Sequence, residues 1–200
     1  MKLRTTIFSM TLLFNVTLIC SSNLFAQNKR TNIWYFGEYG GVDFNSTSPA
    51  ALSNGVLNTV EGCATICDDN GNLLFYTNGV EVFNKQHVIM PNGSGLFGGT
   101  SSSQSALIVP MPGNNVLYYV FTIAETAGSN GFCYSIVDMA LDNGNGDISS
   151  KNVTVLNSVS LSERLAGTMH SNGQDIWVCV RGDLTNTYYA YQITPSGLTT

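Results

Sequence analysis

The sequence feature that most constrains the fold is a repeated unit, first met from Gly62 to Lys85 as GCATICDDNGNLLFYTNGVEVFNK. In its opening residues two sets of side chains alternate, as on the two faces of a β-strand. Asp68 to Gly71 tolerate the positive φ of a tight turn. Residues 73–77 are apolar on both faces, as in a strand covered on both sides, and Asn78-Gly79 is a strong hairpin signal. The unit therefore predicts three short antiparallel strands joined by two turns.

Two later segments repeat this order of small residue, turn, aromatic strand and return strand. They begin at Ala106 and Ala166, against Ala64 in the first unit. Starts that lie roughly 40 to 60 residues apart are typical of repeats that each form one small antiparallel sheet. The apolar residues 88–90 and 152–156 are candidates for a fourth strand in the sheets that precede them.

A three-stranded unit cannot bury both faces of its aromatic strand alone, so it needs neighbours. We therefore expect an all-β fold over residues 27–200, an incomplete β-propeller of about three to four blades. Residues 32–36 and 42–44 belong to an opening blade or to the strand that closes the ring. Propellers close with about four to eight blades, so the remaining blades are expected in a longer parent chain. The alternative is a β-sandwich, which needs no closure.

Helical periodicity is nearly absent from the chain after residue 26. Residues alternate at period two, or run apolar for a few positions between Gly and Asn turns, as is typical of all-β proteins. Residues 158–165 are the one weak helical candidate, about a single turn in length.

Residues 1–26 have the pattern of a secretory signal peptide. They combine a basic start, an apolar run over residues 7–19 and a small residue, Ala26, at the cleavage position. A retained membrane anchor is disfavoured because the apolar run is short. A lipid-modified Cys20 is disfavoured because Thr17 stands where that signal usually has leucine. We expect a secreted or cell-surface protein with no membrane insertion after cleavage.

The charge balance excludes two classes of partner. The chain has 8 Lys and Arg against 13 Asp and Glu, for a net charge of -5, and cleavage would remove Lys2 and Arg4. Nucleic acids and anionic membranes need clustered basic residues, and no such cluster is present.

Four cysteines follow the signal peptide: Cys63, Cys67, Cys133 and Cys179. Cys63 and Cys67 would lie about 13 Å apart on one strand, at about 3.3 Å per residue, which is too far for a disulfide. A bridge to either later cysteine requires neighbouring strands, and buried free thiols are the favoured interpretation. The short CxxC spacing is missing and no histidine is near a cysteine, so zinc is disfavoured. No metal-binding or cofactor-binding residue is assigned.

Six motifs carry a resemblance to a known family. They are NIWYFG (32–37), GVDF (41–44), EGCATI (61–66), NGNLLFYTNGVEVFN (70–84), MPNGSGL (90–96) and YSIVDM (134–139). Together they resemble the N-terminal propeller-like region of large secreted Bacteroidota proteins that end in a gliding-motility-associated, type IX secretion sorting domain. The resemblance spans about residues 32–200 and implies export across both membranes. The sorting domain itself is not in the sequence, which agrees with an incomplete chain, and the family supplies no catalytic residues.

Three short motifs invite a functional interpretation but are better explained as turns. Residues 68–72 resemble the first part of a calcium loop, yet the glycine comes too early and no Glu follows. Residues 142–147 are a better calcium candidate, although turns select Asp, Asn and Gly for backbone reasons alone. Residues 181–183 spell the Arg-Gly-Asp triplet read by integrins, and a turn is again the favoured interpretation.

No catalytic motif is recognised. Residues 101–105 lack the glycine frame of a nucleophile elbow and are interpreted as a flexible loop. Three glutamates flank predicted strands, where a propeller could gather residues at one end: Glu61, Glu125 and Glu163. A solvated surface role is expected for them. His87 and His170 are lone histidines, for which hydrogen-bonded structural roles are expected.

The sequence therefore predicts a binding or adhesion scaffold without enzymatic activity, whose partner is an extracellular glycan or a surface protein. Some aromatic residues are candidates for stacking on sugars, although most are expected in the core: Trp34, Tyr35, Trp177, Tyr188 and Tyr189. One alternative is a glycan-active or peptide-active enzyme with carboxylates at the propeller mouth. Another is a structural component of a gliding or secretion machine.

Overall fold

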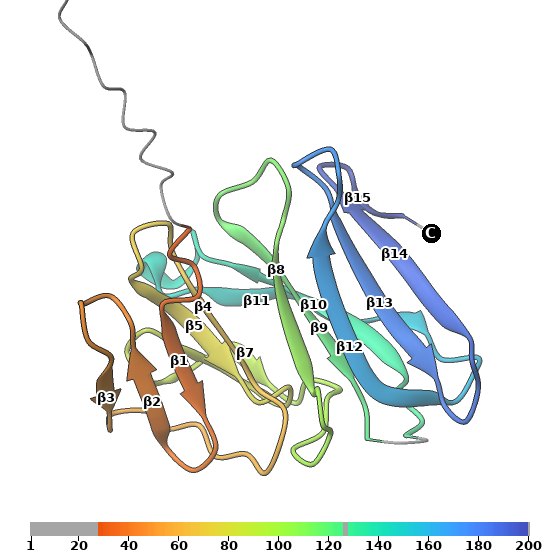
Figure 1. Ribbon diagram of the computed structural model, residues 1–200, viewed down its shortest axis with the longest axis horizontal. Coiled ribbons are helices and arrows are strands. Elements are labelled where there is room, and N and C mark those ends of the chain that lie inside the picture. The colour runs from red at the N-terminus through yellow and green to blue at the C-terminus, as the bar shows by residue number, and fades with distance from the viewer. Residues whose placement is uncertain (1–27, 126–127, 200) are drawn as a thin grey trace, which may run out of the picture.

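The computed structural model describes residues 28–125 and 128–199 and is built from β-strands (Figure 1). The predicted signal peptide lies outside the described residues. Within them there is no α-helix, and the one helical turn is the 3₁₀ element η1 (Asp142–Gly144). No helix in this part of the chain has the length and apolar character needed to cross a membrane.

The strands form four antiparallel sheets, each from one continuous stretch of chain, with neighbours in sequence also neighbours in the sheet. Sheet 1 contains β1 (Ile33–Phe36), β2 (Gly40–Asp43) and β3 (Ala50–Leu52). Sheet 2 contains β4 (Ala64–Cys67), β5 (Leu73–Thr77), β6 (Glu81–Asn84) and β7 (Ile89–Ser94). Sheet 3 contains β8 (Ala106–Pro110), β9 (Leu117–Ile123), β10 (Phe132–Asp138) and β11 (Asp147–Leu156). Sheet 4 contains β12 (Leu161–Met169), β13 (Ile176–Gly182), β14 (Tyr188–Thr194) and β15 (Gly197–Thr199).

The predicted turns of the first unit are confirmed and have local causes. The Asp68 carboxylate accepts hydrogen bonds from the backbone N–H groups of Asn70 and Asn72 at 2.8 and 2.9 Å. In the β5–β6 hairpin, the side-chain oxygen of Asn78 accepts from two following backbone N–H groups, and Gly79 has a φ of 86°. These bonds satisfy turn amides that no strand partner reaches, which is why Asp, Asn and Gly are favoured there.

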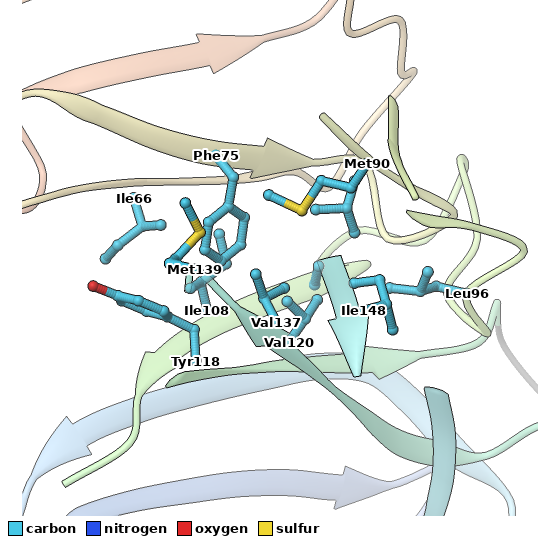
Figure 2. Close-up of a cluster of buried hydrophobic side chains, with 12 residues drawn as sticks. Ile66, Phe75, Met90, Leu96, Ile108, Tyr118, Val120, Val137, Met139 and Ile148 are labelled. Atoms are coloured by element: carbon cyan, nitrogen blue, oxygen red, sulfur yellow. The ribbon is translucent and has the colours of Figure 1, made fainter. Parts of the chain in front are cut away.

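The four sheets pack side by side in chain order, and a hydrophobic cluster fills each of the three interfaces. The first strands β1, β4, β8 and β12 contact one another in succession, and the outer strands β7 and β11 also touch. Figure 2 shows the cluster between sheets 2 and 3, where Phe75 and Met90 from one sheet meet Val120 and Val137 from the other. Sheets 2 and 3 are therefore covered on both faces.

Strand β9 shows why the central strands are aromatic on both faces. Tyr118 and Val120 belong to the cluster shared with sheet 2, whereas Tyr119 and Phe121 belong to the cluster shared with sheet 4. All four side chains are buried. Full burial of a large apolar side chain contributes about 1.5 to 3 kcal/mol, so one strand stabilises two interfaces at once.

The structure corrects one secondary-structure prediction and shows how many sheets the described residues form. The weak helical pattern over residues 158–165 was misleading, because β12 begins at Leu161 and its irregular first half disturbs the alternation of period two. Two facing sheets, as in a β-sandwich, do not describe the chain, because the described residues form four sheets with three interfaces.

The repeat starts proposed from the sequence are not all equivalent positions. Ala64 and Ala106 pack against the same cluster from opposite sheets, so Ala64 faces the following sheet and Ala106 the preceding one. The order of elements in the units is as predicted. A shift of one position exchanges the two faces of a strand, so the first strands of the units that start at Ala64 and Ala106 are offset from each other by one residue.

Candidate functional site

The loop of residues 99–105, which leads into sheet 3, is bonded to the segment before sheet 2, to the β5–β6 turn and to strand β12. The Gly62 N–H donates to the Ser102 carbonyl at 3.0 Å, and the Ser105 hydroxyl donates to the Asn78 carbonyl at 2.8 Å. A side chain at Gly62 would collide with the loop backbone at Ser105. The prediction of a flexible loop is therefore wrong, since bonds to residues distant in sequence fix its path.

A β-bulge in strand β12 positions Glu163. Leu161 pairs with Gly182 and Leu165 with Val180, so the residues between them leave the regular ladder. Bulges of this kind redirect side chains and are frequent next to binding sites. Here one Glu163 carboxylate oxygen accepts the Ser103 backbone N–H at 2.9 Å and lies 3.1 Å from the Ser103 hydroxyl.

Glu61 reaches the same serine from the segment before sheet 2. Its carboxylate lies 3.0 Å from the Ser103 hydroxyl, so the segment before sheet 2, the loop before sheet 3 and the first strand of sheet 4 meet at one side chain. A hydroxyl carries one proton and can donate to one of the two carboxylates at a time. Glu125 lies against Gly99 of the same loop. Instead of the solvated surface role expected for them, Glu61 and Glu163 contact the same serine, which fits the alternative of a carboxylate pair for these two glutamates.

A cleft of about 550 Å³ opens next to this cluster. Its lining residues are Ser103, Gln104, Ser162, Glu163, Arg164, Arg181, Asp183 and Leu184. The Arg181 guanidinium donates to the Thr185 carbonyl through Nε and Nη2 at 3.2 and 3.0 Å, which fixes its orientation. The Gln104 side-chain oxygen accepts the N–H of Leu165 at 3.0 Å. The cleft offers both signs of charge and hydroxyl groups, and no aromatic ring lines it.

A second, more apolar cleft of about 530 Å³ is lined by β8, the edge strand of sheet 3, and reaches strands β4 and β12. Arg30 lies at its edge, where Nε donates to the Asp69 carboxylate at 2.6 Å. Nη1 of the same guanidinium lies 3.4 Å from the Tyr118 hydroxyl. Sequence reasoning did not find this cleft, since its lining combines ordinary strand residues with turn residues from segments far apart in the chain.

The two candidate calcium loops are turns. In the first, the Asp68 carboxylate accepts hydrogen bonds from the amides of the turn. Burial of this carboxylate opposes its ionisation, but the hydrogen bonds outweigh the effect of burial and lower the pKa of Asp68. In the second, Asp147 accepts from the Asn92 side chain, and the Gly144 carbonyl accepts from Lys85 Nζ at 2.9 Å. Over residues 28–125 and 128–199, no three His, Cys, Asp or Glu side chains form a group that could hold a metal ion.

The Arg-Gly-Asp triplet does not project from the surface as a loop tip. Gly182 is buried in β13, and its N–H donates to the Thr187 carbonyl at 2.9 Å. The tip of the β13–β14 hairpin is instead Leu184, whose side chain is 95% exposed. This geometry supports the interpretation of the triplet as part of a turn.

Both histidines have the structural roles expected from the sequence. The His87 ring lies between the Tyr76 hydroxyl, 3.0 Å from Nδ1, and the Asn54 amide nitrogen, 2.7 Å from Nε2. Burial lowers the pKa of His87. His170 Nδ1 accepts the Asn172 N–H at 3.0 Å, and its ring packs on Trp177.

The fold buries some of the aromatic residues proposed for sugar stacking and leaves others exposed. Tyr35 is buried and stacks on Tyr76 with ring centroids 4.6 Å apart. Trp34 and Tyr188 are exposed, on opposite end sheets, while Tyr189 is half-buried and packs against the cluster between sheets 3 and 4. None of them lines the polar cleft.

The four described cysteines are free thiols. Burial raises the pKa of Cys63, Cys67 and Cys133, so the nucleophilic thiolate is disfavoured at all three. The prediction that Cys63 and Cys67 do not pair with each other is confirmed.

Comparison of the chain with models of protein families, with curated proteins and with solved structures found no match.

Proposed function

We propose that the chain is a β-propeller-like binding module that acts outside the cell. Sheets that follow one another in the chain and meet through their first strands are typical of propeller blades, which supports the architecture. The signal-peptide pattern and the resemblance to exported Bacteroidota proteins support export by the type IX pathway and a secreted or cell-surface location. In this proposal, further blades of a longer parent chain complete the ring.

The observation that carries the binding proposal is the convergence of Glu61, Ser103 and Glu163 beside the polar cleft. The cleft is lined by the loop before sheet 3 and by residues of sheet 4 with its β13–β14 hairpin, and Glu61 holds Ser103 from the segment before sheet 2. Concave sites with a few convergent polar groups are the usual ligand sites of proteins. Its hydroxyl and charged groups suit an extracellular glycan or a polar surface segment of another protein.

The test is a binding screen of the purified chain against extracellular polysaccharides and surface proteins. Glu163→Gln and Arg164→Ala should each weaken binding about tenfold or more, as expected when a group central to an interface is lost. Glu38→Gln, which changes an exposed glutamate outside the cleft lining, is the matched control and should bind like the original chain. If both cleft variants bind as tightly as the original chain, the binding site is not this cleft.

One observation favours a second candidate function. Two carboxylates that lie close to one hydroxyl can act as an acid and base pair, as in glycoside hydrolases. Chromogenic glycosides test this alternative: turnover that disappears in both Glu61→Gln and Glu163→Gln would make the protein a glycan-active enzyme. Binding without turnover supports the scaffold, whereas a stable protein partner without glycan affinity supports a structural component of a gliding or secretion machine.

A further inference from the structure

A third cleft, of about 510 Å³, lies between the outer strands of sheets 3 and 4. Its walls are strands β9, β10 and β11 on one side and β15 with the turn before it on the other. The lining residues are Tyr119, Tyr134, Val153, Thr154, Val155, Ser196, Gly197 and Leu198. Four of these side chains also take part in the hydrophobic cluster that joins the two sheets. The cleft is therefore part of the interface between two described sheets and not of an outward face.

Two tyrosine rings line the sheet 3 side of this cleft. Tyr119 is 4% exposed and Tyr134 is half-buried. The rings meet edge to face, with centroids 5.1 Å apart and an interplanar angle of 72°. Both also contact the fully buried ring of Phe121, at centroid distances of 5.4 and 6.0 Å. Packing against the core therefore fixes the positions of the two tyrosine rings before any ligand is present.

The hydroxyl of Tyr119 has no hydrogen-bond partner within the part of the chain that the structure describes, and the same holds for Tyr134. A buried tyrosine hydroxyl usually has such a partner. Three of the four other tyrosines buried in the described residues follow this rule. Their hydroxyls contact one side chain each, in the pairs Tyr35 with Asn54, Tyr76 with His87 and Tyr118 with Arg30. The Tyr119 hydroxyl therefore has an unused hydrogen-bonding capacity.

This hydroxyl lies at the cleft. A Cβ added at Gly197, on the opposite wall, would be 3.7 Å from the Tyr119 oxygen, so the absence of a side chain at Gly197 leaves space in front of the hydroxyl. Burial raises the pKa of Tyr119, so its hydroxyl keeps its proton at neutral pH. It can therefore both donate a hydrogen bond to a group in the cleft and accept one from it.

The chemistry of the lining selects a neutral ligand that is rich in hydroxyl groups. None of the described residues that line the cleft is charged, so it offers no ion pair to a carboxylate, a phosphate or an amine. Its polar side chains all end in hydroxyls, and valine and leucine side chains supply apolar surface beside the two rings. A sugar ring has the matching character, because hydroxyls surround its edge while its C–H faces are apolar. Pockets of this volume with aromatic walls and a few polar groups are typical of small-ligand sites.

We propose that this cleft, which we call the tyrosine cleft, binds a neutral sugar residue of a glycan. The Tyr119 hydroxyl forms a hydrogen bond with a sugar hydroxyl, and the half-buried ring of Tyr134 supplies apolar contact. The polar cleft has the opposite character, since charged side chains line it and no aromatic ring does. The tyrosine cleft is a second site, and its assignment does not depend on the ligand proposed for the polar cleft.

The experiment is titration calorimetry of the purified full chain with short oligosaccharides of glucose, mannose and galactose, and with an oligouronate as their charged counterpart. At least one of the neutral oligosaccharides should bind. Tyr119→Phe should weaken that binding about three- to tenfold, as expected for the loss of one hydrogen bond, and should leave the melting temperature unchanged because no protein hydrogen bond is lost. Tyr134→Ala should weaken it about tenfold or more. Tyr188→Phe removes a hydroxyl from a tyrosine that is 70% exposed and outside the cleft, so this matched control should bind like the original chain.

A variant of the polar cleft separates the two binding proposals. Glu163→Gln should leave the binding of the neutral oligosaccharide unchanged, because Glu163 does not line the tyrosine cleft. Binding that Glu163→Gln abolishes and Tyr119→Phe leaves intact would overturn the assignment of the tyrosine cleft and support the polar cleft instead. A chain that binds none of the neutral oligosaccharides, or binds the oligouronate alone, would also overturn it. Equal affinities for Tyr119→Phe and Tyr188→Phe would do the same.

Discussion

Replacement of Phe121 by alanine tests whether the sheets are held together through their central strands. The side chain is fully buried in β9 and stacks on Tyr119 and Phe132, each with ring centroids 5.4 Å away. A Phe→Ala change in a core costs about 3 to 5 kcal/mol, because apolar burial is lost and a cavity remains. A domain of this size is stable by about 5 to 15 kcal/mol, so Phe121→Ala would remove a large fraction of the total.

The assay is urea unfolding followed by circular dichroism, with a thermal melt alongside. For a chain of this size the melting temperature falls by about 2 to 4 °C for each kcal/mol of lost stability, so the melting temperature of Phe121→Ala should be lower by roughly 6 to 20 °C. Phe97→Ala is the matched control, because that ring is 37% exposed, and its loss should cost less than about 1 kcal/mol. Equal losses for the two variants would refute the claim that the aromatic face of β9 supports the interface with sheet 4.

Three further predictions concern other parts of the molecule. Gly62→Ala should lower the melting temperature and weaken binding at the polar cleft, because its Cβ would displace the loop at Ser105; a variant as stable as the original chain would contradict the packing described. Burial lowers the pKa of His87 in the folded state, so as pH falls the unfolded chain protonates first. The stability contributed by neutral His87 is therefore full above the unfolded value of about 6.5 and is lost as pH falls toward the folded pKa. His87→Gln should reduce this loss between pH 7.5 and pH 5 in urea titrations, and an unchanged pH profile would contradict the assignment. In native conditions a thiol-specific dye should label half-exposed Cys179 before buried Cys67 and Cys133, while urea should equalise their rates; peptide mapping by mass spectrometry checks the order.

The secondary structure of the sheets was readable from the sequence because its causes are local. The Asn78-Gly79 hairpin and the Asp68 turn depend on side chains that bond to backbone amides two to four residues away. The apolar run of residues 73–77 likewise reports that both faces of β5 are covered. The weak helical pattern over residues 158–165 failed for the opposite reason, because the bulge in β12 is stabilised by contacts with residues distant in sequence.

The sequence by itself determined the tight turns, the repeated order of elements and the central strands of sheets 2 to 4, since each depends on neighbours within a few residues, whereas it did not identify β3 and β15. Only the tertiary structure decided that Glu61 and Glu163 meet at Ser103, from which they are 42 and 60 positions away in the chain. It also decided which aromatic side chains are buried: Tyr35 faces a neighbouring sheet, while adjacent Trp34 faces solvent. Pleating fixes the alternation of side chains along a strand, but which side is covered depends on where the next sheet packs.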